Sequence, residues 1–572
     1  MCRCSVTGGL MKVAIFGSGM GGLAAAHELV ERGFAVDVYD RLSVPGGKAR
    51  SVVIEREGQR GLPGEHGFRF FPGFYRHVID TMERTPLPGG GHAADNLVAA
   101  SMGYFASEHG PPLMAPSIGP RNIREIVEHM ADMAGFRKVL STADLEHFVG
   151  KLWQVMTSCE ERRLAEYEQQ SWVEFIDAAN QSVAYQQWFA GAMTRTLIAA
   201  SGDRASARTV GDILVALLLD GMRWGKQSDR LLNGPTNEVW VGPWHQYLVG
   251  KGVRFHFDTT VLELQLDDAG DRLAGVVTSG SDGTHAVVAD HYILAVPVEV
   301  ASKLFSDAIA AAAPSLAGAR TLGSDVAWMS GMQFYLREDV PIVNGHIAFA
   351  GSPWGLTAIS QNQFWKHRIA DDGDHTVHGV LSVDVSDWNT AGHNGLTARQ
   401  CTPDQIRNEA LDQMRRCLPG VPPEKLADAN IHSYFIDPDI VFFGAGEGAG
   451  ATDNHEPLFI NVCGSHDLRP HAHTELANFF LASDYVQTNT DLASMEGANE
   501  AARRAVNAIL ERTGSTAPRC KVWELHQPRS LALFRWLDRR RFQRGEAWSS
   551  HFPRPIHWVS QVLHLATRKA DR

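Results

Sequence analysis

Residues 11–50, MKVAIFGSGMGGLAAAHELVERGFAVDVYDRLSVPGGKAR, limit the folds open to this chain more than any other stretch. Residues 13–16 form an apolar run typical of a parallel strand that is covered on both faces. Glycines with the G-x-G-x-x-G spacing follow directly, and these are Gly17, Gly19 and Gly22. The first permits a tight turn, the second lets a pyrophosphate approach the backbone, and the third lets helix and strand pack closely. The segment therefore predicts a dinucleotide site at the start of a parallel sheet.

A helix and a second strand complete the predicted βαβ unit. Residues 23–32 predict a helix whose N-terminal amides and positive dipole end face the phosphates. Residues 35–39 predict the second strand, and Asp40 follows it, where a carboxylate accepts hydrogen bonds from ribose hydroxyls. Glycine-rich turns are common, so the alternative is a structural turn in some other βαβ unit. The flanking strand, helix and acid favour the dinucleotide site.

The residues after Asp40 narrow the choice of dinucleotide. Gly46, Gly47 and Lys48 follow at a spacing that resembles the FAD-binding flavoproteins of the amine oxidase and carotenoid desaturase superfamily. In that superfamily the glycine pair passes close to the diphosphate, and arginine is usual where this chain has Lys48, which also supplies a cation. The resemblance implies FAD as the cofactor, bound noncovalently in an extended form.

A second block, more than 400 residues later, matches the same superfamily. Residues 479–482 predict a strand that leads into Asp484, and a helix is expected to start near Ser494 and Met495. Similar flavoproteins carry L-A-G-D-Y and then S-M-E-G-A; this chain keeps the pattern with Ser483 in place of the glycine. The resemblance implies that the acid binds the ribityl or phosphate part. It also implies that the helix start faces the pyrimidine end of the isoalloxazine, which becomes negative on reduction.

Residues 61–77, GLPGEHGFRFFPGFYRH, are rich in glycine and aromatic side chains. From composition alone, an aromatic core loop is the favoured interpretation. The run is also similar to the segment that follows the fingerprint in plant-type phytoene and zeta-carotene desaturases, where it passes along the flavin and the substrate cavity. Arg69 stands where those enzymes tend to carry histidine. Its place makes Arg69 the best polar candidate for a catalytic residue near the flavin.

The motifs and the resemblance together give a set of predicted cofactor-binding residues. Val261 belongs to it because family members place the strand ending near this position beside the adenine. The full set is Gly17, Gly19, Gly21, Gly22, Asp40, Arg41, Gly47, Lys48, Gly67, Phe68, Arg69, Val261, Asp484, Ser494 and Met495. No metal site is expected, because the 25 histidines form no H-x-x-x-H or comparable cluster on a convincing helix.

The 572 residues exceed what one hydrophobic core usually serves, so two lobes are expected. The predicted fold class is α/β: a two-lobe flavoprotein with a Rossmann-like FAD-binding domain and an inserted, mixed α+β substrate domain. The FAD-binding domain is assigned residues 11–88, 231–300 and 456–515, and the substrate or cap domain is assigned residues 89–230 and 301–455. Within the cap, residues 89–230 are expected to be helix-rich and without strands, with helices over 123–134, 145–156, 171–179 and 207–220. Further strands are expected over 329–335, 346–350, 379–385, 431–435 and 456–464.

Two apolar features of the cap domain leave alternatives open. Residues 212–219, DILVALLL, are apolar all round, which indicates a helix that is buried on every side or one that lines an apolar cavity. For Trp354 and Trp365 the alternatives are a place facing the flavin or the substrate and a place in the core. Burial in the core is the favoured interpretation in both cases.

Composition limits the partners and the compartment. The formal net charge of −12 argues against general nucleic-acid binding. Seven scattered cysteines, an odd number, favour reduced thiols in a cytoplasm. No signal peptide is visible, and no apolar run approaches the ~18–20 residues of a spanning helix. A cytoplasmic protein is expected, and any membrane contact must be peripheral.

The C-terminal tail, residues 516–572, is a basic amphipathic segment with 12 Lys or Arg against 4 Asp or Glu. Apolar residues such as Leu533, Trp536 and Leu537 interleave with arginines. Such a helix can lie on an anionic bilayer surface. Equally, it can pack on the acidic body of its own chain or on a partner subunit.

By resemblance, the expected reaction is hydride transfer from a carbon of an apolar substrate, an isoprenoid, polyene or lipid, to flavin N5, with oxygen or a quinone as the electron acceptor. An apolar tunnel with few acid-base groups would suffice for this desaturation. Three alternatives remain: a flavin amine oxidase, a redox-neutral polyene or fatty-acid isomerase, and a non-catalytic flavin- or lipid-binding protein.

Overall fold

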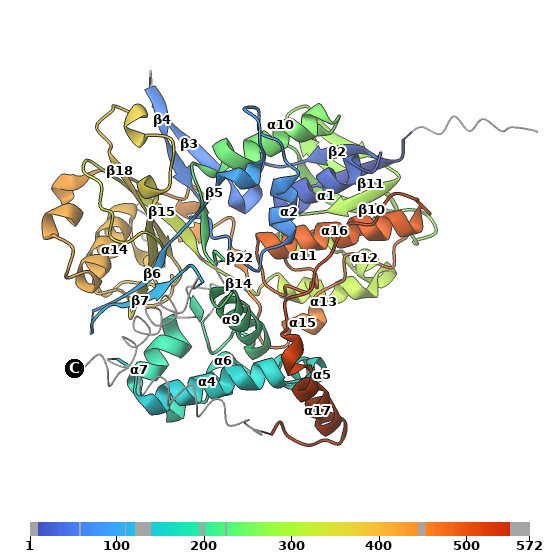
Figure 1. Ribbon diagram of the computed structural model, residues 1–572. Helices are drawn as coiled ribbons and strands as arrows, with labels where there is room; N and C mark the ends of the chain where they lie inside the picture. The colour runs from blue at the N-terminus through green and yellow to red at the C-terminus, as the bar shows by residue number, and fades with distance from the viewer. Residues whose placement is uncertain are drawn as a thin grey trace, which may run out of the picture.

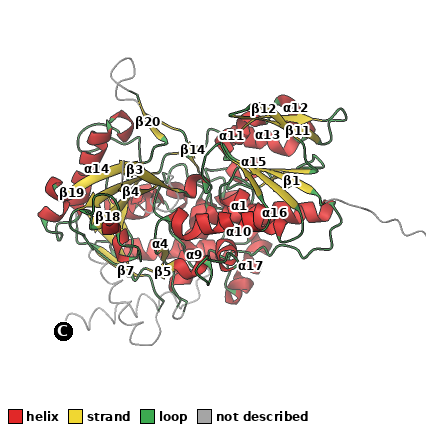
Figure 2. Ribbon diagram, turned by 90° about the horizontal axis from the view of Figure 1, so that it is seen from above, coloured by secondary structure: helices red, strands yellow, loops and turns green. Residues whose placement is uncertain are grey.

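The computed structural model describes residues 10–56, 59–108, 110–119, 139–192, 194–195, 201–223, 226–443 and 452–549. These residues form two lobes built on sheets, with a group of helices below them (Figures 1 and 2). The helix predicted over 123–134 and the end of the basic tail lie outside the described residues.

A five-stranded parallel sheet is the centre of the first lobe. Its order is β23-β13-β1-β2-β9, so segments from both ends and the middle of the chain pair side by side. The strands are β1 (Lys12–Phe16), β2 (Ala35–Tyr39), β9 (Arg254–His256), β13 (His291–Leu294) and β23 (Phe479–Leu481). Val13, Ala14, Ile15 and Phe16 are completely buried, as the apolar run predicts.

Helices α1 (Met20–Val30) and α16 (Met495–Arg512) pack against each other beside this sheet (Figure 1). Their approach is close because α1 begins with glycines and α16 buries a row of alanines, Ala498, Ala501, Ala502 and Ala505. Small side chains allow two backbones to come together without leaving a cavity. The first lobe also contains α2 (His77–Glu83) and α10 (Gly242–Gly250).

A three-stranded antiparallel sheet, β10 (Thr260–Leu266), β11 (Leu273–Gly280) and β12 (Gly283–Val287), adds to the first lobe. The prediction that a strand ends near Val261 is wrong. The chain leaves the parallel sheet at His256, turns at Asp258 with φ of 52°, and Val261 lies near the start of β10. Short helices α11 (Val298–Leu304), α12 (Asp307–Ala312) and α13 (Ala317–Leu322) follow β13.

The second lobe is built on a seven-stranded sheet of order β19-β15-β18-β17-β16-β6-β7. Its strands are β6 (Met102–Ser107), β7 (Leu113–Pro116), β15 (Ser330–Leu336), β16 (Ile347–Ala350), β17 (Thr357–Ser360), β18 (Gly379–Val385) and β19 (Ile431–Ile436). The expectation of no strands in residues 89–230 is therefore wrong. The sequences of β6 (MGYFAS) and β7 (LMAP) do not alternate between apolar and polar residues, and they are strands because the edge at β16 pairs with β6.

Smaller pairings link the segments between the large sheets. Two-stranded sheets join β3 (Ser51–Arg56) with β4 (Gln59–Glu65), and β5 (Leu97–Ala99) with β8 (Arg230–Leu232). Two more join β20 (Ile440–Phe442) with β21 (Thr452–Asn454), and β14 (Val326–Ala327) with β22 (Leu458–Phe459). The strand predicted over 456–464 is thus only the two residues of β22. α14 (Pro403–Cys417) packs on the second lobe, where Trp354 and Trp365 are core residues as predicted.

The helical group consists of α4 (Thr142–Thr157), α5 (Glu160–Arg162), α6 (Trp172–Phe175), α7 (Val183–Tyr185) and α9 (Ala207–Gly221). The helix predicted over 171–179 is shorter than expected. Ser171 and Glu174 form a capping box at its start, and Asp177 adopts a left-handed conformation with φ of 52° that ends it.

The chain after α16 runs back along the first lobe and then joins the helical group. The backbone amide of Trp523 donates to His77 Nε2 at 3.0 Å, and α17 (Ala532–Gln543) packs beside α4 and α5 (Figure 1). There the buried Asp538 accepts hydrogen bonds from Arg162 Nε. Through the side that carries Asp538, α17 therefore packs on its own chain, one of the two alternatives; contact of its exposed side with a bilayer stays a prediction.

Candidate functional site

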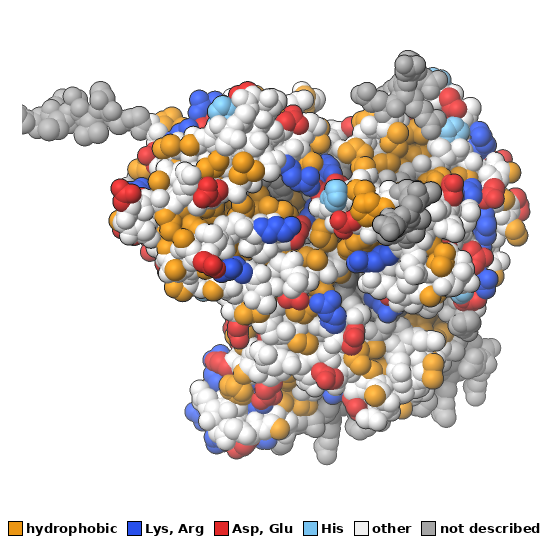
Figure 3. Space-filling model, turned by 180° about the vertical axis from the view of Figure 1, so that it is seen from behind, with side chains coloured by type: hydrophobic (Ala, Val, Ile, Leu, Met, Phe, Trp, Pro, Cys, Tyr) orange, Lys and Arg blue, Asp and Glu red, His pale blue; other side chains and the backbone are white. Residues whose placement is uncertain are grey.

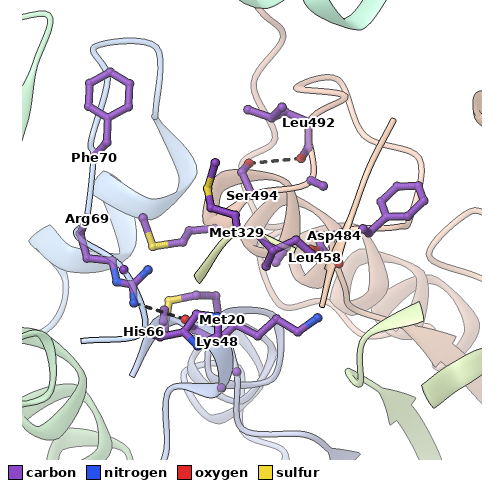
Figure 4. Close-up of a pocket in the computed structure, with 18 of the residues that line it drawn as sticks. Met20, Lys48, His66, Arg69, Phe70, Met329, Leu458, Asp484, Leu492 and Ser494 are labelled. Atoms are coloured by element: carbon purple, nitrogen blue, oxygen red, sulfur yellow. Dashed lines mark hydrogen bonds between the residues drawn. The ribbon is translucent and has the colours of Figure 1, made fainter. Parts of the chain in front are cut away.

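One large cavity, of about 840 Å³, lies where the two lobes and α9 meet. This volume is within the roughly 300–1,000 Å³ that is usual for ligand sites. Of the fifteen residues predicted to bind the cofactor, fourteen line this cavity, although they come from segments far apart in the sequence. The exception is Gly22, which packs against the glycine turn itself. Figure 4 shows Met20 and Lys48 from the fingerprint facing Asp484 and Ser494 across the cavity.

The glycine turn leaves room for a pyrophosphate beside the backbone. A Cβ on Gly22 would lie 1.8 Å from the carbonyl oxygen of Gly17, so only glycine permits this packing of turn and helix. Gly47 has a φ of +53°, and a Cβ there would lie 2.9 Å from Cα of Gly19. The two glycine motifs thus meet at the cavity wall. A channel of bare backbone next to a helix N-terminus fits the diphosphate of a dinucleotide.

Asp40 holds the glycine turn as well as lining the cavity. Its Oδ2 accepts hydrogen bonds from Ser18 Oγ at 2.7 Å and from the Ser18 amide, and its Oδ1 accepts from the Leu42 amide at 2.8 Å. A carboxylate offers about four acceptor positions, so capacity remains for a ribose hydroxyl.

The predicted cations at the diphosphate are paired with acids that the sequence did not single out. Lys48 Nζ lies 2.8 Å from Glu299 Oε1, and Arg41 pairs with Glu456. Arg50 also pairs with Glu456, at 2.6 Å. Glu299 and Glu456 reach the cavity from distant segments, so no local signal could have placed them beside the fingerprint.

The N-terminus of α16 supplies the opposite wall. Ser494 is the N-cap residue, and its hydroxyl accepts from the Gly497 amide at 3.2 Å. Glu496 turns away and accepts hydrogen bonds from the amides of residues 76–78 and from His77 Nδ1, which ties the helix to the loop before α2. The positive end of an 18-residue helix therefore faces the cavity, where it would stabilise a negatively charged ring.

Arg69 lies in the cavity wall formed by the aromatic loop (Figure 4). Its Nη2 donates to the carbonyl oxygen of Lys48 at 3.3 Å, which places it beside the second glycine motif. Burial lowers the pKa of Arg69, while Glu65 and Asp384 act in the opposite direction. An arginine donates hydrogen bonds and rarely accepts a proton, so Arg69 suits a binding or electrostatic role better than that of a base.

The cavity is more polar near Arg69 than the expected apolar tunnel. His346 Nδ1 lies 2.7 Å from Asp229 Oδ2, and both residues line the cavity together with Asp384. Burial raises the pKa of Asp384 to about 7, and it raises the pKa of nearby Glu65 to about 7. Sequence reasoning missed these groups. The signal that could have identified Asp384 is an acid within the strand GVLSVDV, since this strand is buried along its whole length.

The other arm of the cavity is apolar. Leu217 and Leu218 line it from α9, whereas Ile213, Leu214, Val215 and Ala216 of the same helix are buried. Both alternatives for the DILVALLL segment therefore hold, because part of the helix belongs to the core and part of it lines the cavity. Phe105 and Ile347 line the cavity from β6 and β16, and Leu218 is 38% exposed.

Among the described residues, one cluster has a spacing that could suit a metal ion. Ligand atoms of His66, Asp437 and Asp439 lie within 4.8 Å of one another. Arg50 already pairs with Asp439, so a guanidinium provides the counter-charge at this place. The absence of a metal site stays a prediction.

The fold and the site define a class: a two-lobe α/β protein with a dinucleotide cradle that opens into an apolar cavity. The chain belongs to the family of flavin containing amine oxidoreductases, which matches residues 20–510. FAD is its cofactor, and it is an FAD-dependent oxidoreductase of the desaturase or amine-oxidase type. The family recognised from the motifs is confirmed; the contacts of individual residues with FAD stay predictions.

Curated relatives include several carotenoid desaturases. A zeta-carotene desaturase of Solanum lycopersicum is 23% identical over 527 residues, covering 86% of this chain and 80% of its own. A probable zeta-carotene desaturase of Synechococcus elongatus is 24% identical over 532 residues, covering 88% and 99%. The 15-cis-phytoene desaturase of Synechococcus elongatus is 22% identical over 537 residues, covering 88% and 96%.

Solved structures of similar fold include amine oxidases. A putrescine oxidase with bound putrescine has a TM-score of 0.57 at 14% identity, covering 88% of this chain and 99% of that one. Cyclohexylamine oxidase from Brevibacterium oxydans has a TM-score of 0.56 at 15% identity, covering 88% and 100%. At these identities the likeness shows the two-lobe fold alone.

Proposed function

We propose that this enzyme desaturates an extended apolar substrate, an isoprenoid or polyene, by transferring a hydride from carbon to FAD. The apolar arm of the cavity carries this proposal. Leu217, Leu218, Phe105 and Ile347 line it from α9, β6 and β16, whereas the glycine motifs line another part of the same cavity, so a hydrocarbon chain can lie there with one bond presented to the cofactor. The similarity to carotenoid desaturases supports the same substrate class.

The residues of this chain contribute orientation and exclusion of water. Hydride transfer from carbon needs the donor bond held close to the acceptor, and a well-oriented arrangement is worth up to ~7–11 kcal/mol of the barrier. The enclosing side chains of α9 and β6 supply that orientation. FAD, when bound, supplies the hydride acceptor.

Amine oxidation is the second candidate, and one observation favours it. Asp384 and Glu65 are buried carboxyl groups near Arg69, and a carboxylate can pair with an ammonium group. The positive charge of Arg69 already interacts with the carboxyl groups of Glu65 and Asp384, so an added ammonium group would face a fixed cation. This arrangement favours the apolar substrate.

An anaerobic absorbance titration of the FAD-loaded protein tests the proposal. Zeta-carotene and 15-cis-phytoene, each in detergent, are compared with putrescine and cyclohexylamine. Bleaching of the flavin by a polyene, with a product lighter by two hydrogens, is the expected result. Bleaching by an amine alone would move the enzyme to the second candidate. Polyene isomerisation that requires prior reduction of the flavin would instead identify an isomerase.

The basic tail is proposed to bring this enzyme to an anionic membrane surface, where apolar substrates dissolve. On α17, Leu533, Trp536 and Leu537 are 62%, 43% and 45% exposed, and Arg540 lies over the Trp536 ring at 4.0 Å. Such a mixture of arginine and apolar side chains suits the bilayer interface. Within the described residues, no helix is long and apolar enough to cross a membrane. On the face seen in Figure 3, basic and acidic side chains are interspersed.

Co-sedimentation with vesicles tests the membrane proposal. Binding to vesicles of phosphatidylcholine and phosphatidylserine should exceed binding to pure phosphatidylcholine, and Trp536→Glu should weaken it. Equal sedimentation of the wild type and of Trp536→Glu would refute the contact.

The proposed electron acceptor is oxygen or a quinone. Stopped-flow reoxidation of the reduced flavin with oxygen or with a soluble ubiquinone analogue distinguishes the two.

A further inference from the structure

Asp384 is a buried acid that hydride transfer alone does not explain. It lies in β18, it is 7% exposed, and it lines the cavity. Its Oδ1 has no hydrogen-bond partner among the described residues. Asp384 accepts a hydrogen bond from the backbone amide of Phe68, so Oδ1 is the oxygen left unsatisfied. A buried carboxyl oxygen that lacks a partner costs free energy, so its presence in a fully buried strand calls for a role.

The seven-stranded sheet orders the cavity wall from polar to apolar. Asp384 is directly opposite Thr357, Thr357 is opposite Ala348, and Ala348 is opposite Phe105. Residues directly opposite on neighbouring strands share one face of a sheet. All four line the cavity, so the carboxyl group marks one end of this row and the phenyl ring marks the other.

The polar end of the row is the end next to the cofactor motifs. Gly67 packs on Asp384, because a Cβ there would lie 3.0 Å from Oδ1. Two residues later, Arg69 bonds the carbonyl oxygen of Lys48, which follows Gly47 of the second glycine motif. Asp384 therefore lies where the apolar arm meets the cofactor part of the cavity.

We propose that Asp384 is the catalytic base of the desaturation, a role that rests on the proposed function. Forming a double bond removes two hydrogens from neighbouring carbons. One leaves as hydride, with two electrons, to FAD. The other leaves as a proton to the Asp384 carboxylate, and the electron pair of that C–H bond becomes the new C=C bond. The carboxyl group then releases its proton before the next turnover.

A carboxylate suits this step better than a neutral base. Loss of hydride leaves positive charge on the substrate carbons, and a negative group fixed in a dry cavity stabilises that charge. A proton next to such a carbon is acidic, so a weak base is sufficient. Burial raises the pKa of Asp384 to about 7, which lets it exchange a proton near neutral pH. The charged or titratable groups that face it are Arg69, His66 and His346.

Infrared spectroscopy tests the titration of Asp384 without any substrate. Difference spectra of the FAD-loaded protein, recorded one pH unit on either side of 7, should contain a protonated-carboxyl band that disappears as pH rises. The buried Glu65 titrates in the same range, so Asp384→Asn should remove one component of this band and Glu65→Gln the other. As a matched control, Asp372→Asn removes a buried carboxyl group outside the cavity and should leave both components. An unchanged spectrum of Asp384→Asn would refute the assignment.

Anaerobic stopped-flow with zeta-carotene tests the catalytic role. Flavin reduction should slow at least ~100-fold in Asp384→Asn and remain near wild type in Asp372→Asn. In the wild type the rate should rise with pH through about 7, because only the carboxylate accepts a proton. Reduction within threefold of wild type in Asp384→Asn would refute the role of Asp384 and leave the proposed function intact.

Asp384→Glu keeps the test decisive if Asp384→Asn does not bind FAD. It should retain measurable reduction with a shifted pH midpoint, because the carboxyl group moves by one methylene and its environment changes. An unshifted midpoint would refute the proposal. If no polyene reduces the wild-type flavin, the proposed function fails, whereas the infrared result on Asp384 still stands by itself.

Discussion

Replacing Gly21 with alanine tests whether the start of α1 and the end of β23 form one rigid cradle for FAD. The added Cβ would lie 1.9 Å from the carbonyl oxygen of Ala482, whereas ordinary contact begins at 3.4 Å. The helix and the end of β23 must therefore separate by about 1.5 Å. Because Gly19 and Asp484 line the cavity from these two elements, the separation widens the site that both of them form.

The expected loss follows from the cost of overpacking. Forcing an extra methyl group into a close contact costs ~1–3 kcal/mol. If the FAD-bound state bears this cost, FAD binds ~5- to 150-fold more weakly, since 1.4 kcal/mol is a factor of ten. FAD affinity is measured by quenching of flavin fluorescence, and the thermal unfolding of the apoprotein is measured in parallel.

Gly89→Ala is the matched control, since a Cβ there meets nothing within 4 Å. It should bind FAD as tightly as wild type. FAD affinity of Gly21→Ala within twofold of wild type would refute the cradle, because the close approach of Gly21 to Ala482 would then not matter to the cofactor.

Three further predictions concern stability and access. Asp538→Asn leaves the buried Arg162 with the exposed Glu166 as its anionic partner, so unfolding should become easier by ~1.5–3 kcal/mol in chemical denaturation; an effect below ~0.5 kcal/mol would refute the anchoring of α17. Burial raises the pKa of Glu65 from 4.5 to about 7, so its contribution to stability is fully present below pH 4.5 and falls by about 3 kcal/mol as pH rises through 7. Glu65→Gln should therefore lose less stability than wild type as pH rises from 4.5 through 7. An equal loss in both proteins would contradict the raised pKa of Glu65. Leu218→Trp should raise KM for zeta-carotene with little change in kcat, because Leu218 lines the exposed part of the apolar arm. An unchanged KM would exclude entry of the substrate past Leu218.

The sequence predicted the cofactor half of the site because its signals are local. A strand, a glycine turn and an acid within 30 residues set the geometry around Gly17 and Asp40, whatever the rest of the chain does. The same holds for the start of α16, where Ser494 caps a helix that the alanine pattern predicts. The pairing of β1 with β13 and of β13 with β23 then brings residues from both ends of the chain to one cavity.

The substrate half could not be predicted because it depends on pairing between distant strands. Asp384 reaches the cavity through its registers with Gly331 and Thr357, which no pattern along β18 reveals. Glu456 meets Arg41 and Arg50 across more than 400 residues of chain. The strands β6 and β7 exist because the edge of the second sheet pairs with them, which local periodicity does not show.

A crystal structure of the FAD complex with bound zeta-carotene tests the central claim most directly, because that claim assigns one cavity to both molecules. We expect the isoalloxazine between the N-terminus of α16 and the loop that carries Arg69. We also expect the hydrocarbon along Leu217 and Phe105, with its reacting carbons next to Asp384. A polyene bound outside this cavity, or an isoalloxazine far from both Arg69 and Met495, would contradict this assignment.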